Sequence, residues 1–270
     1  MTQVPASRLL AACEWIFGAR DLPRMASRLA ASGYDGIEIV GEPKRPDVKQ
    51  LESFLDSSGL RVTGTTAQSQ PLEERDLAHP DRDLRRLAVA YYQGCVELAA
   101  RLEAPTIGLL PSAEGRLGPI SSYQREWKLA VEAAREVAYF AGEHGVAIAI
   151  EPLNRYEAFL VNRVEQALAF AEEVGVVSAG IVADLFHMNI EEADPGAALE
   201  QAEGRLLEIH LADSNRRGLG HGHLPLEHLL SVAAQTDFDG AYVMEFVAVS
   251  DTELDGFLDE SAAFLRRERS

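Results

Sequence analysis

Short apolar runs alternate along the chain with longer segments of helical period, and the alternation repeats about eight times. Apolar residues three and four positions apart are typical of amphipathic helices, whereas compact apolar runs are typical of buried strands. The expected strands are residues 9–17, 36–40, 61–66, 106–110, 146–150, 179–184, 206–211 and 242–246.

Helix signals fill several of the intervening segments. Residues 21–33 begin with a capping aspartate, Asp21, and end with a glycine, which is the usual order of start and stop signals. Residues 82–102 and 123–145 are rich in helix-forming residues throughout. We therefore expect helices over these three segments.

The alternation of strands and helices predicts an α/β protein whose parallel strands close into a (β/α)8 TIM barrel. A doubly wound open sheet is the alternative. That fold would place a glycine-rich fingerprint after its first strand, and none follows Phe17. Because no linker or change of composition divides the chain, we expect residues 1–270 to form a single domain.

Acidic residues dominate the charge of the chain. Asp and Glu number 43 against 25 Lys and Arg, so the formal net charge is −18. Such a surface repels phosphate backbones and anionic lipids, and we therefore expect neither nucleic acid nor membrane as a partner. Cys13 and Cys95 show no pairing pattern, which favours a cytoplasmic location.

Candidate chemistry gathers at the ends of the last four expected strands. Glu151 and Asp184 end the fifth and sixth, His210 lies in the seventh, and Glu245 lies in the eighth. In a barrel these strand ends meet at one face, so the four side chains can converge. Three carboxylates and one imidazole form a hard donor set, which favours Mn²⁺, Mg²⁺ or Co²⁺.

Each of the four residues also has a purely structural interpretation. Glu151 could be a solvated strand end, Asp184 a helix cap, His210 a core histidine and Glu245 the partner of an arginine. Their occurrence at the same end of consecutive strands favours the metal site over four separate structural roles.

Further polar residues surround these positions. Glu38 and Glu208 lie within the second and seventh expected strands, and Glu38 fits either the barrel mouth or a structural role. Glu157 could orient Glu151 or a substrate hydroxyl. The alternative is a surface carboxylate without a role in the site.

Two expected loops at the same rim carry cationic or titratable side chains. His187 follows Asp184 closely, and the glycine-punctuated loop 210–225 carries Arg216, His221 and His223. Glycines allow close approach of the backbone to a ligand, although a mobile surface loop is the alternative.

Three motifs carry a resemblance to a known family: E-P-L-N-R-Y-E (151–157), D-L-F-H-M-N-I-E-E (184–192) and H-L-A-D-S-N-R (210–216). Together they resemble the ketose 3-epimerases of the D-tagatose/D-psicose type, within the xylose isomerase-like TIM barrels. The resemblance runs over nearly the whole chain. Residues 162–163, Leu185 and Leu226 depart from the usual pattern without removing a candidate ligand, and they leave the exact sugar open.

The resemblance implies one divalent metal ion, usually Mn²⁺, and a small sugar or keto-sugar acid as substrate. It also implies a homodimer or homotetramer. The matches to the metal ligands are Glu151, Asp184, His210 and Glu245. Glu151 and Glu245 match the catalytic acid/base pair, and the matches to the substrate-binding residues are Glu157, His187 and Arg216.

Epimerisation next to a ketone needs a carbon-bound proton to leave and return on the opposite face through an enediolate. Two carboxylates beside a metal ion suit that reaction, and they suit an aldose–ketose isomerase of the hydroxypyruvate or xylose type nearly as well. An abasic-site endonuclease would need more histidines and a basic groove than a chain with seven histidines and a charge of −18 offers. A sugar-binding barrel without catalysis is a further alternative.

Overall fold

Eight parallel strands close into a barrel. The structure, a computed structural model, describes residues 8–18, 22–68 and 70–268. The strands are β1 (Leu10–Cys13), β2 (Gly36–Val40), β3 (Arg61–Thr66), β4 (Thr106–Leu109), β5 (Ala147–Ile150), β6 (Ala179–Asp184), β7 (Leu206–Leu211) and β8 (Ala241–Met244). Because β1 is hydrogen-bonded to both β2 and β8, the sheet has no edge. The predicted (β/α)8 barrel is confirmed and the open-sheet alternative is wrong.

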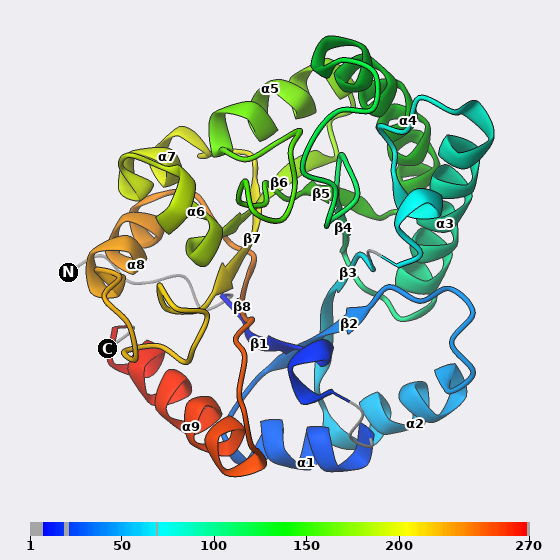
Figure 1. The fold of residues 1–270 in the computed structure, drawn as a ribbon. Helices are drawn as coiled ribbons and strands as arrows, with labels where there is room; N and C mark the ends of the chain where they lie inside the picture. Colours follow the sequence, from blue (N-terminus) through cyan, green and yellow to red (C-terminus); the bar gives the residue numbers. More distant parts are fainter. Residues whose placement is uncertain (1–7, 19–21, 69, 269–270) are drawn as a thin grey trace.

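Helices form a ring around the strands, as Figure 1 shows. They are α1 (Leu22–Ala31), α2 (Val48–Ser58), α3 (Arg82–Arg101), α4 (Tyr123–Glu143), α5 (Val164–Val174), α6 (Leu185–Glu191), α7 (Pro195–Gln201), α8 (Leu226–Gln235) and α9 (Asp251–Glu268). The three predicted helices correspond to α1, α3 and α4, whereas the predicted cap Asp21 lies outside the described residues. One barrel takes in the whole described chain, and domain limits at residues 1 and 270 stay a prediction.

The first strand is shorter than predicted. β1 ends at Cys13, and the predicted continuation to residue 17 forms the 3-10 helix η1 (Glu14–Phe17) instead. The Glu14 carboxylate accepts a hydrogen bond from the Val40 amide at 2.8 Å and pairs with Arg45 at 2.7 Å. The prediction was wrong because a short apolar run is buried equally well as a strand or as a turn.

Strand periodicity decides which side chains enter the barrel. Successive residues of a strand point to opposite faces, so Glu208 and His210, two positions apart in β7, share the inner face.

Both thiols, Cys13 and Cys95, are free and buried. Within the described ranges, the helices are too short or too polar for any of them to cross a membrane.

Candidate active site

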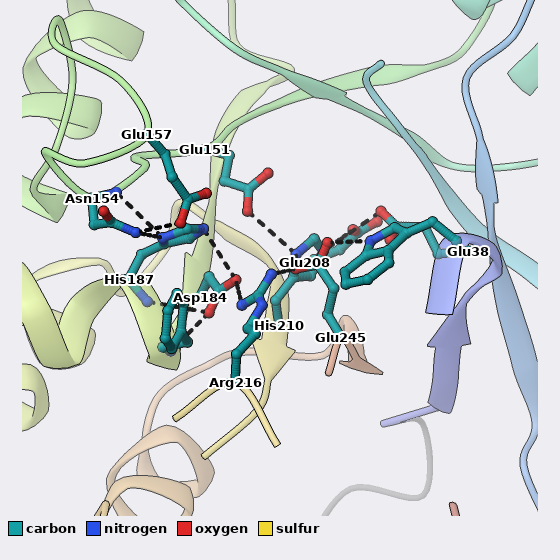
Figure 2. Close-up of polar contacts among 12 residues, drawn as sticks. Glu38, Glu151, Asn154, Glu157, Asp184, His187, Glu208, His210, Arg216 and Glu245 are labelled. Atoms are coloured by element: carbon teal, nitrogen blue, oxygen red, sulfur yellow. Dashed lines mark hydrogen bonds and ion pairs between the residues drawn. The ribbon is translucent and has the colours of Figure 1, made fainter. Parts of the chain in front are cut away.

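Four side chains converge at the carboxyl ends of β5 to β8. Glu151 follows β5, Asp184 ends β6, His210 lies in β7 and Glu245 follows β8. Each offers a donor atom, and these atoms all lie within 4.8 Å of one another. All four side chains are buried, with exposed fractions of 6% or less. Figure 2 shows them grouped around His210.

The His210 ring lies at the centre of this group. Its Nδ1 atom is 2.9 Å from Glu245 Oε2 and 3.4 Å from Glu151 Oε1. Burial by itself would lower the pKa of His210, but the charges of Glu245, Glu38 and Glu151 outweigh burial and raise it well above its usual value. The imidazole is therefore surrounded by negative charge.

Asp184 has two roles in the structure. Its Oδ1 atom caps α6 by accepting hydrogen bonds from the amides of Phe186, at 2.8 Å, and His187, at 3.4 Å. Its Oδ2 atom instead pairs with Arg216 Nη1. The helix-cap interpretation is thus correct, and it leaves one carboxylate oxygen available to the cluster.

Arg216 places a guanidinium between two of the carboxylates. Nη2 is 2.6 Å from Glu245 Oε2, Nη1 contacts Asp184, and the group lies 4.9 Å from the centre of the Phe186 ring. The residue has a left-handed φ of 59° in the glycine-punctuated loop. Glu245 therefore does pair with an arginine, as its structural interpretation predicts, and this ion pair lies within the cluster.

Glu151 and Glu245 have different electrostatic surroundings. Burial raises the pKa of Glu151, and the attraction of His210 only partly opposes this effect. Burial would also raise the pKa of Glu245, but Arg216, His210 and a 2.8 Å hydrogen bond from Trp15 Nε1 together hold it well below its usual value.

A second chain of contacts links His187, Asn154 and Glu157. His187 lies in α6 rather than in the predicted loop. Its Nδ1 atom accepts from the Asn154 side-chain amide at 2.8 Å, so its Nε2–H can face the site, 3.6 Å from Asp184. The same amide donates to Glu157 Oε1 at 2.7 Å. Glu157 is half-buried and no hydrogen bond to Glu151 is found in the described chain, so the idea that it orients Glu151 is not supported.

Two candidate histidines do not join the cluster. His221 Nε2 is 2.6 Å from Glu260 Oε2, and His223 Nδ1 is 2.8 Å from Ser214 Oγ, with both side chains exposed. Among the described residues, neither belongs to a group that could hold a metal ion. The loop contributes Arg216 alone of its three cationic or titratable candidates.

Glu38 and Glu208 lie inside the barrel rather than at its mouth. Glu38 Oε1 is 3.5 Å and Glu208 Oε2 is 3.6 Å from His210 Nε2, on the other side of the ring from Glu151 and Glu245. Burial raises the pKa of Glu38 to about 7. The Thr106 hydroxyl donates a hydrogen bond to Glu208 Oε1.

Three contributors were not anticipated from the sequence. Trp15 donates to Glu245, Asn154 connects His187 with Glu157, and Phe186 lies under the Arg216 guanidinium. Asn154 and Phe186 lie within the motifs that carry the candidate ligands, so their place in the sequence could have indicated a role at the site. Trp15 carries no such signal, because the apolar pattern of residues 9–17 predicts a strand there.

A large cavity lies at the other end of the barrel. It has a volume of about 890 Å³ and is lined by the amino ends of β3, β4, β7 and β8, including Thr106 and Glu208. None of the four clustered ligand residues lines it. We place the candidate site at the carboxyl ends because the convergent buried donors lie there, and because barrel chemistry is carried by that face.

Relatives with known names are similar to this chain in sequence. The chain is 30% identical over 235 residues to the D-psicose 3-epimerase of Ruminiclostridium cellulolyticum, covering 83% of this chain and 78% of that protein. It is 27% identical to the 3-dehydro-D-guloside 4-epimerase of Escherichia coli, covering 87% and 90%. These relatives do not favour the aldose–ketose isomerase alternative.

A solved structure agrees in fold. The D-psicose 3-epimerase with D-tagatose from Clostridium cellulolyticum H10 superposes with a TM-score of 0.88 at 25% identity, covering 97% of this chain and 99% of that one. Residues 26–268 match the family described as Xylose isomerase-like TIM barrel. The chain therefore belongs to the xylose isomerase-like TIM barrel family, in which its relatives include ketose 3-epimerases.

Proposed function

We propose that the protein is a metal-dependent ketose 3-epimerase, which inverts the carbon next to the ketone of a ketohexose or keto-sugar acid. The observation that carries the proposal is the buried cluster of three carboxylates and one imidazole at the carboxyl ends of β5 to β8. The named relatives add support, since they are epimerases of ketoses or keto-sugars.

The donor set fits one divalent cation. When all are ionised, Glu151, Asp184 and Glu245 bring three negative charges, and Arg216 offsets one of them, so a charge of up to −2 remains to be balanced. Buried carboxylates without a counter-charge are costly, and a divalent ion supplies the missing charge. Oxygen-rich donors with one imidazole suit Mn²⁺, with Mg²⁺ and Co²⁺ as alternatives. When bound, the ion would supply Lewis-acid stabilisation of charge on the ketone oxygen.

Glu151 and Glu245 are suited to move the proton. Both carboxyls reach His210 Nδ1, one from the end of β5 and the other from the end of β8 (Figure 2). One carboxylate takes the proton from the carbon next to the ketone, which leaves an enediolate, and becomes a carboxylic acid. The other, initially protonated, returns a proton to the opposite face and becomes a carboxylate.

His187, Arg216 and Glu157 would bind the sugar. Asn154 holds His187 with its Nε2–H toward the site, where it can donate to a sugar oxygen. The planar Arg216 guanidinium can bind two oxygens together, including those of a carboxylate. Glu157 would accept a hydroxyl through the oxygen that Asn154 leaves available.

Three further features belong to this proposal. We propose a cytoplasmic enzyme that acts on a small sugar or keto-sugar acid and assembles as a homodimer or homotetramer. Light scattering of the purified protein measures the assembly, and a monomeric mass would contradict that part.

Product analysis tests the function directly. Mn²⁺-loaded protein would be incubated separately with D-fructose, D-tagatose, D-psicose, L-ribulose and a 5-ketohexonate, and the products separated by chromatography. The proposal predicts a C3 epimer, or in the acid the epimer next to the ketone. An aldose product would assign an isomerase instead. No product from any sugar would contradict the proposal. The Asp184→Asn variant, which lacks one carboxylate, is the inactive control.

A further inference from the structure

Two carboxylates lie inside the barrel behind the His210 ring. Glu38 Oε1 and Glu208 Oε2 are 3.5 and 3.6 Å from His210 Nε2, and all three side chains are at most 2% exposed. Barrel interiors are ordinarily filled by Val, Ile and Leu, and buried acids are expensive. A pair of acids at this depth therefore needs a physical explanation.

Neighbouring strands are adapted to hold Glu208. The Thr106 hydroxyl on β4 donates to Glu208 Oε1. Gly64 on β3 leaves room for the same oxygen, since a Cβ at that position would collide with it. The period of β7 sets Glu208 below His210 on the inner face. The carboxylate therefore has a prepared place beside the imidazole.

The state of the imidazole explains what these acids do. Nδ1 is the ring nitrogen that faces Glu151 and Glu245, so it is the one that would meet the metal ion. A neutral imidazole that binds through Nδ1 carries its proton on Nε2. A buried N–H needs an acceptor, and Nε2 has no hydrogen-bond partner in the described chain. The acceptors placed beside it are Glu38 and Glu208.

We infer that Glu38 and Glu208 are positioning residues, which hold the Nε2–H of His210 and so present its Nδ1 atom to the metal ion. The inference rests on the proposed metal-dependent function. A carboxylate behind a metal-binding histidine fixes its tautomer and ring orientation and makes it a stronger ligand. Both residues act on the metal through His210, and their effect appears first in metal affinity.

Calorimetric titration with Mn²⁺ tests the inference without turnover. The Glu208→Gln and Glu38→Gln variants are expected to bind Mn²⁺ about 10- to 100-fold more weakly than the wild type. The melting temperature of each metal-free variant shows whether the barrel still folds, so that a weaker affinity can be assigned to the site rather than to unfolding. Unchanged Mn²⁺ affinity in both variants would overturn the inference.

Thr106 supplies a matched pair of variants that leaves both carboxylates in place. Thr106→Val removes the hydroxyl that holds Glu208, and should weaken Mn²⁺ binding, whereas Thr106→Ser keeps the hydroxyl and should restore it. Thr63→Val is the control, since Thr63 has a buried hydroxyl without a hydrogen-bond partner in the described chain. Equal affinity in the Val and Ser variants of Thr106 would count against the inference.

Stoichiometry separates this role from a second cation site. The 890 Å³ cavity at the amino ends of the strands reaches Glu208, so an ion could enter there. One Mn²⁺ per wild-type chain supports the positioning role, whereas a second ion that is lost in Glu208→Gln would overturn it. Failure of the proposed function looks different: the wild type would bind no Mn²⁺, or would bind it and epimerise no ketose.

Discussion

The two halves of the barrel contribute differently to the site. Strands β5 to β8 each carry one of the four clustered donors at or beside their carboxyl ends, and no donor of that cluster comes from β1 to β4. The first half instead brings groups that support those donors directly or through Glu208: Trp15 after β1 binds Glu245, Glu38 on β2 lies beside His210, and Thr106 on β4 binds Glu208. The second half thus carries the proposed chemistry, and the first half adds groups that fix its geometry, together with supports such as Glu208 on β7.

This difference implies a ranking of mutational effects. Removing a donor from β5 to β8 removes a reacting group or a metal ligand. Removing a support from the first half leaves every donor present and changes only its orientation or charge. We therefore expect a substitution of a donor in the second half to lower activity strongly, and a substitution of a support in the first half to lower it moderately.

Metal removal should have the largest effect. Dialysis against a chelator is expected to abolish epimerase activity, and Mn²⁺ should restore it, because the reaction would lose the Lewis acid that stabilises charge on the ketone oxygen. Mn²⁺ should also raise the melting temperature, since an ion that binds only the folded state stabilises it. Full activity in chelator-treated protein shown to be free of metal would contradict this prediction.

The acid/base pair comes next. Glu151→Gln and Glu245→Gln should each lower kcat by about 10² or more, the usual contribution of a positioned acid or base. Glu172, an exposed acid on α5, provides the control, and Glu172→Gln should turn over normally. Near-normal kcat in both site variants, measured with saturating Mn²⁺, would show that other groups move the proton.

Trp15 tests the supporting half. Trp15→Phe removes the 2.8 Å hydrogen bond to Glu245, and a hydrogen bond to a charged group contributes roughly 1.5–3 kcal/mol. We expect kcat/KM to fall about tenfold, which corresponds to the lower end of that range. Trp127 makes a similar 3.0 Å bond to Glu173 on the surface, so Trp127→Phe is the matched control. Equal kinetics in the two variants would remove Trp15 from the support of the site.

The smallest expected effect concerns Asp213, in the loop that carries Arg216. Its carboxylate should make the free energy of unfolding depend on pH. Burial would raise the pKa of Asp213, but the amides of Ser214, Leu224, Gly222 and Gly220 outweigh burial and lower it below its ordinary value of 3.8. The ionised carboxylate therefore contributes stability above pH 3.8, and this contribution is lost as the pH falls through the lowered pKa.

The Asp213→Asn variant measures that contribution. Its difference in unfolding free energy from the wild type should be constant above about pH 5 and should shrink in more acid solution. Denaturant titrations at several pH values provide the measurement. Asp194→Ala, which removes the cap of the distant α7, should lose about 1 kcal/mol, the usual contribution of a cap. A difference for Asp213→Asn that grows toward acid pH would contradict the assigned sign.

The sequence revealed the donors because of where they stand. Glu151 and Asp184 interrupt apolar runs at strand ends, and a charge in that place is informative because a buried charge is costly unless it is paired. The closed barrel could be predicted equally well, because eight alternating strand and helix segments are compatible with few topologies. The family prediction carried by the three motifs is confirmed.

The supporting residues of the first half, β1 to β4, could not be predicted in the same way. Trp15 was assigned to a strand, and only the turn at Glu14, fixed by Val40 and Arg45, directs the indole toward Glu245. The place of Glu38 behind His210 depends on how far β2 lies around the barrel from β7. Contacts between residues so distant in sequence follow from closure and register, which single-sequence periodicity does not specify.

Proton exchange with solvent tests the central claim, that two carboxylates move a carbon-bound proton next to the ketone. Mn²⁺-loaded protein and the ketose that it epimerises would be incubated in D₂O and followed by NMR. The new epimer should carry deuterium at C3 and none at C1, because the returned proton comes from a group in exchange with solvent. Deuterium at C1 with an aldose product, or an epimer that keeps its original hydrogen at C3, would contradict it.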